Sequence, residues 1–445
     1  MRGLLSDLKR DDQTAADELR LDVGTLRRAI AGDAPLPAEI VARAVQIWPV
    51  NERDFYAVHD DTTFDIKQMS AAESFATRRT LKRRGRDYYE YRDTAMSRLC
   101  LLRPEWIRMI QVVDDNDPYN KQIQWNDGHL LYQFTYFIGS VNYYYEDRGR
   151  RYCVQMNTGD SVFGKPYAPH SFASRDPSQL ALILALTYGG RLSGDGQQEL
   201  GGCGLEIAAR LMLPAADETT LQAARLRSLL ANGSHSVDQL AKASGLSVQQ
   251  ISRALSEGES DLEVLRPLAN ALRVPLRELL AAADDTCNGV VISQRTSTDC
   301  WLLPDAKDPS YEIQPLACSA LTPYARSLEL RPLKSGHIAS PEVLEVALHQ
   351  YVYNIGCDPI VMSWLSGGLW RDARLEPGDS LYIKPCVPCT FRRAENEDVE
   401  ARVLLLRIGG KVVGDAVLEA SLCGGEVISR MLQDDKPWFR AQGRN

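Results

Sequence analysis

The chain has 445 residues, of which 44% are hydrophobic and 25% are charged, and this length allows two to four compact domains with buried cores. Its 51 basic and 59 acidic residues give a net charge of −8, which removes any general electrostatic attraction to nucleic acid. No apolar stretch approaches the roughly 20 residues that a membrane span needs, and the first residues lack the apolar segment of a secretion signal. We therefore expect a globular protein of the cytoplasm.

Ten cysteines are scattered between Cys100 and Cys423 without a repeated spacing. This pattern indicates a reducing compartment rather than a disulfide framework, and we expect most of the thiols to be buried. Cys386 and Cys389 have the spacing of half a zinc site, but no second pair follows at a usable distance. We therefore do not expect zinc there.

The first predicted element is a helical module over residues 1–60, in which apolar residues recur at helical spacing. Its segment 21–30 matches the segment 246–255 in the placing of apolar residues, and the later copy lies in a second helical module over 217–283. Residues 236–255 combine two serine caps with a glycine turn between them, and so resemble a helix-turn-helix.

Larger modules follow each helical module, over residues 61–210 and 290–445. Apolar and polar residues alternate in the segments 132–138, 351–355 and 401–407, which are bounded by Gly, Asp and Pro. This alternation predicts two antiparallel β-barrels.

The two halves of the chain are related by duplication. Segments 159–172 and 378–391 are identical at seven of fourteen positions, with an offset of 219 residues, and the helical segments are offset by 225. Similar offsets mean that one unit, a helical module followed by a barrel, was duplicated whole. The predicted fold class is therefore mixed α+β, as a tandem repeat.

Two motifs resemble those of the cupin superfamily, whose fold is a double-stranded β-helix. The first is Gly128-His129-x3-Gln133-x5-Gly139, and the second is the Gly-Asp-x4-Lys-Pro-x2-Pro-His phrase that ends at His170. The resemblance implies that both larger modules are cupin barrels.

The motif residues His129, Gln133 and His170 form a candidate metal site. Ferrous iron in oxygenases is usually held by two histidines and a carboxylate, and here a glutamine takes the place of the carboxylate. Residues four apart in a straight strand are separated by roughly 13 Å, so we expect His129 to end one strand and Gln133 to open the next. A neutral amide leaves a formal +2 site, which favours a dianionic ligand such as a phosphonate.

The alternative is that these residues have only a structural role, because a histidine in an apolar strand is often a hydrogen-bonded core residue. Two of only six histidines fall on the two motif positions, which favours the metal. In the second barrel the corresponding residues are Val346, Gln350 and Cys389. We therefore expect the second barrel to be metal-free and structural.

Helix-turn-helix plus cupin, duplicated in one chain, resembles the family of 2-hydroxyethylphosphonate dioxygenase and methylphosphonate synthase. The resemblance covers nearly the whole chain and is carried by Asn126-Asp-Gly-His129, by Tyr-Ala-Pro-His170 and by residues 83–91. It implies that Fe(II) is the cofactor and that 2-hydroxyethylphosphonate and O2 are the substrates. It also implies a role in the biosynthesis of phosphonate antibiotics. The implied phosphonate-binding residues are Arg83, Tyr91, Asn126 and Lys9, and the lysine, delivered from a neighbouring subunit in the family, implies a dimer or tetramer.

Gly164, six residues before His170, lies at a position that bears on which product the enzyme forms. Some members of the family carry a glutamate ligand at this place, and methylphosphonate synthases are expected to carry isoleucine. With glycine there, the resemblance favours the dioxygenase, which cleaves the carbon–carbon bond of 2-hydroxyethylphosphonate to give hydroxymethylphosphonate and formate. All four electrons then come from the substrate, so no 2-oxoglutarate is consumed.

Three alternatives remain. Methylphosphonate synthase shares the substrate but yields methylphosphonate and carbonate, and the related single-cupin epoxidases of hydroxypropylphosphonate match less well because they lack the duplication. The third alternative is a transcription regulator whose second helices read DNA; its contacts would be Arg27, Arg28, Gln249, Gln250 and Arg253. The net charge of −8 argues against this last function.

Overall fold

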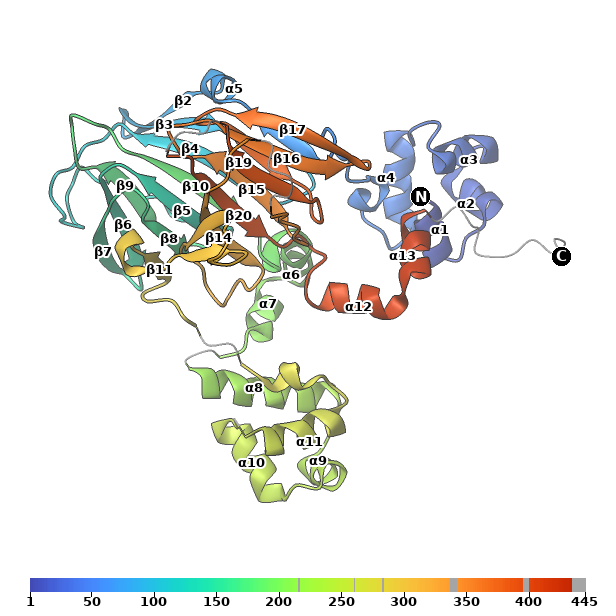
Figure 1. Ribbon diagram of the computed structural model, residues 1–445. Helices are drawn as coiled ribbons and strands as arrows, with labels where there is room; N and C mark the ends of the chain where they lie inside the picture. Colours follow the sequence, from blue (N-terminus) through green and yellow to red (C-terminus); the bar gives the residue numbers. More distant parts are fainter. Residues whose placement is uncertain (215–216, 260, 282–283, 337–341, 395–399, 434–445) are drawn as a thin grey trace. The chain divides into compact units, whose positions relative to one another are not determined.

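The computed structural model describes residues 1–214, 217–259, 261–281, 284–336, 342–394 and 400–433 (Figure 1). They fall into two compact units, one of residues 1–61 together with residues 410–433, and the other of the described residues within 62–409. Helices and antiparallel sheets occur in both halves of the sequence, so the predicted mixed α+β class is confirmed.

The N-terminal unit is built from short helices around a small apolar core. Its core side chains include Leu5, Leu19, Leu26 and Trp48. The helices are α1 (Arg2–Asp7), α2 (Asp12–Leu19), α3 (Val23–Ala31), α4 (Ala38–Ile47) and η1 (Glu52–Phe55), together with α12 (Asp415–Cys423) and α13 (Gly425–Leu432). The predicted range 290–445 therefore extends past the second barrel, because its last helices group with residues 1–61.

The second helical module has the predicted helix-turn-helix. Ser236 and Ser247 cap their helices by accepting hydrogen bonds from the backbone N–H groups of Gln239 and Gln250. Gly245 ends the first of these helices with a φ of 76°, a conformation that favours glycine. The helices are α8 (Glu218–Asn232), α9 (Val237–Ser244), α10 (Val248–Glu257), α11 (Leu262–Leu272) and η3 (Leu276–Leu279), preceded by η2 (Leu192–Gly196), α6 (Gln197–Cys203) and α7 (Leu205–Leu211).

Each barrel consists of a seven-stranded sheet and a three-stranded sheet. In the first barrel the orders are β11-β8-β5-β10-β4-β3-β2 and β7-β6-β9. The strands are β2 (Arg79–Arg83), β3 (Arg86–Asp93), β4 (Leu102–Met109), β5 (Tyr132–Ile138), β6 (Val141–Asp147), β7 (Arg150–Met156), β8 (Ser161–Gly164), β9 (His170–Ser174), β10 (Leu182–Tyr188) and β11 (Val290–Ser293). Helix α5 (Ala71–Ala76) precedes β2.

The second barrel repeats this plan, with orders β1-β18-β15-β20-β14-β13-β12 and β17-β16-β19. Its strands are β1 (Ile66–Met69), β12 (Trp301–Leu303), β13 (Tyr311–Pro315), β14 (Ala325–Pro332), β15 (His349–Asn354), β16 (Ile360–Ser366), β17 (Leu369–Leu375), β18 (Ser380–Ile383), β19 (Cys389–Arg393) and β20 (Val403–Ile408). The short helix η4 (Arg295–Ser297) follows β11.

The two halves exchange one strand each. Strand β1, from the first half, pairs with β18 of the second barrel, and β11, from the second half, pairs with β8 of the first barrel. The predicted ranges 61–210 and 290–445 therefore do not coincide with the barrels. No local sequence pattern predicts this pairing, because the paired strands lie far apart in sequence.

Identical residues of the repeated motif hold the exchanged segments. Asp160 accepts a hydrogen bond from the backbone N–H of Arg295 at 2.9 Å, and Asp379 accepts one from Ala71 at 2.7 Å. Lysines of the motif act in the same way, since Lys165 pairs with Asp284 and Lys384 pairs with Asp65. The motif that resembles a cupin signature is thus also the contact between the halves.

An apolar cluster joins the two barrels. It contains Phe134 and Leu184 of the first barrel and Tyr351, Tyr382 and Leu404 of the second. Strand β5, which carries Gln133, is therefore packed on its outer side against the second barrel.

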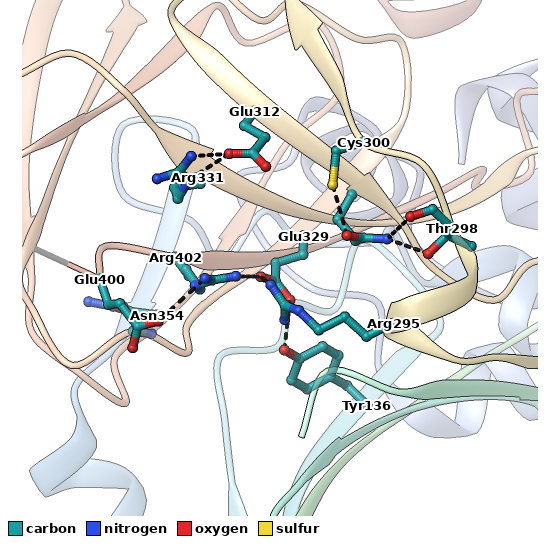
Figure 2. Close-up of polar contacts among 12 residues, drawn as sticks. Tyr136, Arg295, Thr298, Cys300, Glu312, Glu329, Arg331, Asn354, Glu400 and Arg402 are labelled. Atoms are coloured by element: carbon teal, nitrogen blue, oxygen red, sulfur yellow. Dashed lines mark hydrogen bonds and ion pairs between the residues drawn. The ribbon is translucent and has the colours of Figure 1, made fainter. Parts of the chain in front are cut away.

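A buried carboxylate lies at the same junction (Figure 2). Glu329 is 2% exposed and accepts four hydrogen bonds. Two come from the Nη atoms of Arg295 at 2.9 Å, one from Nη1 of Arg402 at 2.6 Å and one from the hydroxyl of Tyr136 at 2.8 Å. Tyr136 belongs to β5, so one charged group of the second barrel is bonded to the strand that carries Gln133.

The cysteines differ from expectation, because only Cys100 and Cys389 are buried and most of the others are exposed. None forms a disulfide within the described part of the chain. Among these residues, too, no helix is both long and apolar enough to cross a membrane.

Candidate metal centre

The three predicted ligands meet at one end of the first barrel. Gln133 is the second residue of β5 in the seven-stranded sheet, and His170 opens β9 in the three-stranded sheet. We expected His129 to end a strand, but it lies in an irregular segment before β5. The turn that the spacing required is therefore made within this segment rather than by a hairpin.

Gly128 makes this turn possible. Its φ is 73°, and a Cβ atom there would lie 2.5 Å from the backbone carbonyl carbon of Tyr167, so only glycine fits. The backbone N–H of Tyr167 donates to the carbonyl of His129 at 2.8 Å. The two motif segments are thus bonded to each other beside the site.

The ligand atoms are close together and oriented. His129 Nε2 lies 3.0 Å from Gln133 Oε1, and the ring centroids of His129 and His170 are 5.7 Å apart. The Nδ1 atoms of His129 and His170 each face a backbone carbonyl, of Leu131 and Ala168, at 2.9 Å. These contacts place the proton on Nδ1 and the lone pair on Nε2, the atom that would bind a metal. In the structure, Nε2 of His170 accepts a hydrogen bond from Asn126 Nδ2.

This geometry tests whether a metal fits. Gln133 Nε2 donates to Thr135 Oγ1 at 2.8 Å, which turns the amide oxygen toward His129. In a neutral His129 with its proton on Nδ1, two acceptors then face each other at 3.0 Å. A cation resolves that repulsion, and two ligands at right angles, each about 2.1 Å from a metal, are separated by about 3.0 Å. The residues present fit a metal.

Asn126 supports the second histidine. Its Oδ1 accepts the backbone N–H of His170 at 2.8 Å, and its Nδ2 donates to His170 Nε2 at 3.0 Å. The pKa of His170 is lowered to about 4, chiefly by burial and to a smaller extent by the charges of His129 and Arg83, while the Ala168 carbonyl acts in the opposite direction. His170 is therefore neutral at physiological pH, as a ligand must be.

A cavity of about 150 Å³ opens beside the three residues. Arg83, Tyr91 and Asn126 line it, so the structure brings these three predicted residues to the same cavity as the candidate metal ligands. Arg83 donates to the carbonyl of Gln124 and lies over the rings of Tyr88 and Tyr89. The pKa of Tyr91 is raised to about 12, chiefly by burial, so its hydroxyl remains a donor.

Lys9 lies in the other compact unit, where it is exposed and donates to the carbonyls of Ser6 and Asp7. Its contact with substrate stays a prediction. Glu105, Thr187 and Tyr89 also line the cavity and were not predicted. Their alternation on strands was visible in the sequence, but which face of each strand points inward was not.

Gly164 stands directly opposite Gln133 in the sheet. A Cβ atom there would meet nothing nearer than the carbonyl oxygen of Gln133 at 3.9 Å. A small second cavity of about 10 Å³, close to the volume of one water, lies between Gly164, Gln133 and both histidines. The amide therefore has open space on this side.

The second barrel keeps the glutamine, as Gln350, but has neither histidine at the corresponding places. The hydrogen bond from Cys386 N–H to the Val346 carbonyl repeats the one at His129, so Val346 stands at the histidine position. Gln350 is opposite Ile383 and Arg407 in the sheet, as Gln133 is opposite Gly164 and Thr187. Arg407 Nε donates to Gln350 Oε1 at 3.1 Å. A guanidinium group thus binds the amide oxygen that would face a metal.

The predicted DNA-reading side chains are mostly engaged within their own modules. Arg253 pairs with Glu259, Arg27 with Asp12, Arg28 donates to Thr25, and Gln250 accepts from Ser247 in a helix cap. Helix stability accounts for these four residues without DNA.

Comparison with known proteins places the chain in a family. It is 38% identical to methylphosphonate synthase of Nitrosopumilus maritimus over 446 aligned residues, which cover 100% of this chain and 95% of that protein. The chain belongs to the family of methylphosphonate synthase and 2-hydroxyethylphosphonate dioxygenase. It is also 26% identical to 2-hydroxyethylphosphonate dioxygenase of Streptomyces viridochromogenes, with 84% of each chain covered.

Structural comparison agrees with this family. The Streptomyces albus 2-hydroxyethylphosphonate dioxygenase with 2-hydroxyethylphosphonate and Fe(II) bound has a TM-score of 0.93 and 40% identity, covering 98% of this chain and 97% of that one. Residues 226–279 also match the helix-turn-helix family HTH_3. The sequence resemblance to this enzyme family is confirmed.

Proposed function

We propose that this protein is an iron-dependent dioxygenase that converts 2-hydroxyethylphosphonate and O2 into hydroxymethylphosphonate and formate. The observation that carries the proposal is the facing pair of acceptors, His129 Nε2 and Gln133 Oε1 at 3.0 Å, completed by His170. Fe(II) bound by these three residues would supply the binding and activation of O2. The structurally similar Streptomyces albus enzyme holds Fe(II) and this substrate.

The cavity residues have roles in holding the substrate. Arg83 offers a fixed guanidinium and Asn126 an amide, which suit the oxygens of a phosphonate dianion. Tyr91 keeps its proton, because burial raises its pKa to about 12, and so donates a hydrogen bond. Lys9 is proposed as a further cation from a neighbouring subunit in a homo-oligomer.

Only the first barrel is proposed to hold iron. Val346 and Cys389 replace the two histidines in the second barrel, and Arg407 binds the amide oxygen of Gln350. A positive guanidinium at that oxygen repels a metal cation.

The second candidate is methylphosphonate synthase, which the 38% identity to the Nitrosopumilus enzyme favours. The open space beside Gly164 supports the dioxygenase, because no side chain restrains Gln133 from that direction. Phosphorus NMR of the iron-loaded protein with 2-hydroxyethylphosphonate and O2 separates the two. Hydroxymethylphosphonate is expected, and a majority of methylphosphonate would overturn the choice.

A Gly164→Ile variant tests the reason for the choice. Ile383, at the corresponding place in the second barrel, is fully buried, so this strand position accepts isoleucine. The variant is expected to shift product toward methylphosphonate, whereas Gly164→Ala, whose Cβ has free space, should leave the ratio unchanged. An unaltered ratio of methylphosphonate to hydroxymethylphosphonate in Gly164→Ile would mean that Gly164 does not determine the product.

A further inference from the structure

Thr135 is a fully buried polar residue of the ligand strand β5, and the proposed function gives it no role. It lies two positions after Gln133, and side chains two apart in a strand lie on the same face of the sheet. Thr135 and Gln133 accordingly line the 10 Å³ cavity together, beside both histidines. Thr135 is not part of the lining of the 150 Å³ cavity, so its hydroxyl acts on Gln133 rather than on a ligand in that cavity.

The amide of Gln133 has two ends of nearly equal shape and opposite chemistry. Its oxygen is an acceptor that binds a cation, whereas its nitrogen carries two donor hydrogens and binds none. When Oε1 is directed at a metal, Nε2 remains in a buried place and needs an acceptor. Thr135 Oγ1 is that acceptor at 2.8 Å, and with this bond made, Gln133 Oε1 lies 3.0 Å from His129 Nε2. The hydroxyl thus suits the orientation of the amide in which its oxygen faces the metal site.

The second barrel shows the same glutamine without this hydroxyl. Val352 lies two positions after Gln350, as Thr135 lies two positions after Gln133, and it is fully buried. Here Arg407 binds the amide oxygen of Gln350, and the buried Nε2 forms no hydrogen bond within the described part of the chain, beside the weakly accepting thiol of Cys389. The hydroxyl is therefore present in the copy that has the histidines and absent from the copy that lacks them.

We propose that Thr135 is a positioning residue of the metal centre, whose hydroxyl oxygen accepts an amide N–H of Gln133 and keeps the amide oxygen directed at Fe(II). Without this acceptor, the orientation that binds iron has a buried, unpaired donor, and the amide turns away to satisfy it. The requirement belongs to the amide alone, because a carboxylate has an oxygen at both ends and no N–H that needs an acceptor. This inference rests on the proposed function, since that function makes Gln133 an iron ligand.

The test measures how tightly variants of the full chain hold Fe(II), by competition with a chelator in the absence of oxygen. Thr135→Val replaces the hydroxyl by a methyl group of similar shape, and the buried Val352 shows that this strand position accepts valine. Its affinity for Fe(II) should fall at least about tenfold, as is usual when a group that orients a metal ligand is removed. Thr135→Ser keeps the accepting oxygen and should bind Fe(II) within about threefold of the wild type.

The same valine substitution in a Gln133→Glu background separates orientation of the amide from general damage to the barrel. A carboxylate at position 133 presents an oxygen to the metal whichever way it turns. Thr135→Val should therefore weaken Fe(II) binding by no more than about threefold in this background, the loss expected for one ordinary hydrogen bond. Damage to the packing around valine would instead lower the affinity by the same factor in both backgrounds.

The inference is overturned if Thr135→Val holds Fe(II) as tightly as the wild type, or if its loss is equal in the glutamine and glutamate backgrounds. Should Thr135→Val fail to fold, Thr135→Ala removes the same oxygen with a smaller side chain and takes its place in both comparisons. A failure of the proposed function gives a different result, in which the iron affinities follow the expected order but phosphorus NMR of the iron-loaded wild type detects no product.

Discussion

Replacing Glu329 by leucine should destabilise the pair of barrels. Glu329 is 2% exposed, whereas the side chains of its partners Arg295 and Arg402 are 31% and 25% exposed. The variant leaves Arg295 and the Tyr136 hydroxyl without this acceptor, and leaves Arg402 with only the exposed Glu400 at 3.4 Å (Figure 2). Breaking a buried ion pair from one side costs about 3–5 kcal/mol. Because both arginines reach water, we expect the lower value, about 3 kcal/mol.

This loss is measured as a fall of about 6 °C in the main thermal transition, at about 2 °C per kcal/mol for a large unit. The matched control is Glu312→Leu, which removes a pair with Arg331 whose side chains are 29% and 45% exposed. An exposed pair contributes at most about 1 kcal/mol, so the control should move the transition by no more than about 2 °C.

A triple variant completes the test. Replacing Glu329, Arg295 and Arg402 together by leucine removes the charges as well as the acceptor, and exchange of a whole buried ion network for apolar residues is often neutral. Most of the lost stability should therefore return. The reasoning is refuted if Glu329→Leu behaves like Glu312→Leu, or if the triple variant is as unstable as the single one.

Two further predictions concern the metal centre. Metal analysis should find one Fe(II) per chain, and the iron should be lost in His129→Ala and His170→Ala. It should be kept in the control His349→Ala, which removes a histidine of the second barrel that bonds to Tyr382. Two irons per chain would contradict a vacant second barrel. Gln133→Glu adds a negative charge, so it should retain iron more tightly against a chelator and bind 2-hydroxyethylphosphonate about tenfold more weakly, by ordinary charge repulsion near the site. Unchanged affinities in both assays would mean that Gln133 is not a ligand.

Much of the architecture follows from the sequence because its signals are local. The capping serines and glycine turn of residues 236–255 bond to neighbours within a few positions, so they predict the helix-turn-helix directly. The alternation in 132–138 coincides with β5. His129, Gln133 and His170 were found by spacing within two short motifs, and the repeat of one motif revealed the duplication.

Other features depend on contacts between distant residues. Nothing near residues 66–69 indicates that they pair with β18, about 300 positions later in the chain, and the exchanged strands therefore escaped prediction. The same holds for Asp160 and Lys165, whose side chains bond to the other half of the chain, although Asp160 also accepts a hydrogen bond from the nearby backbone N–H of Asn157.

The candidate site divides in the same way. By itself the sequence determined the duplicated helical and barrel modules, the two histidines, the amide and the loss of both histidines from the second copy, because motif spacing and periodicity survive without coordinates. Only the tertiary structure decided that His129 Nε2 and Gln133 Oε1 face each other, that Arg407 binds the corresponding amide and that Glu105 enters the cavity. Strand pairing sets which side chains share an inner face, and that pairing joins residues remote in sequence.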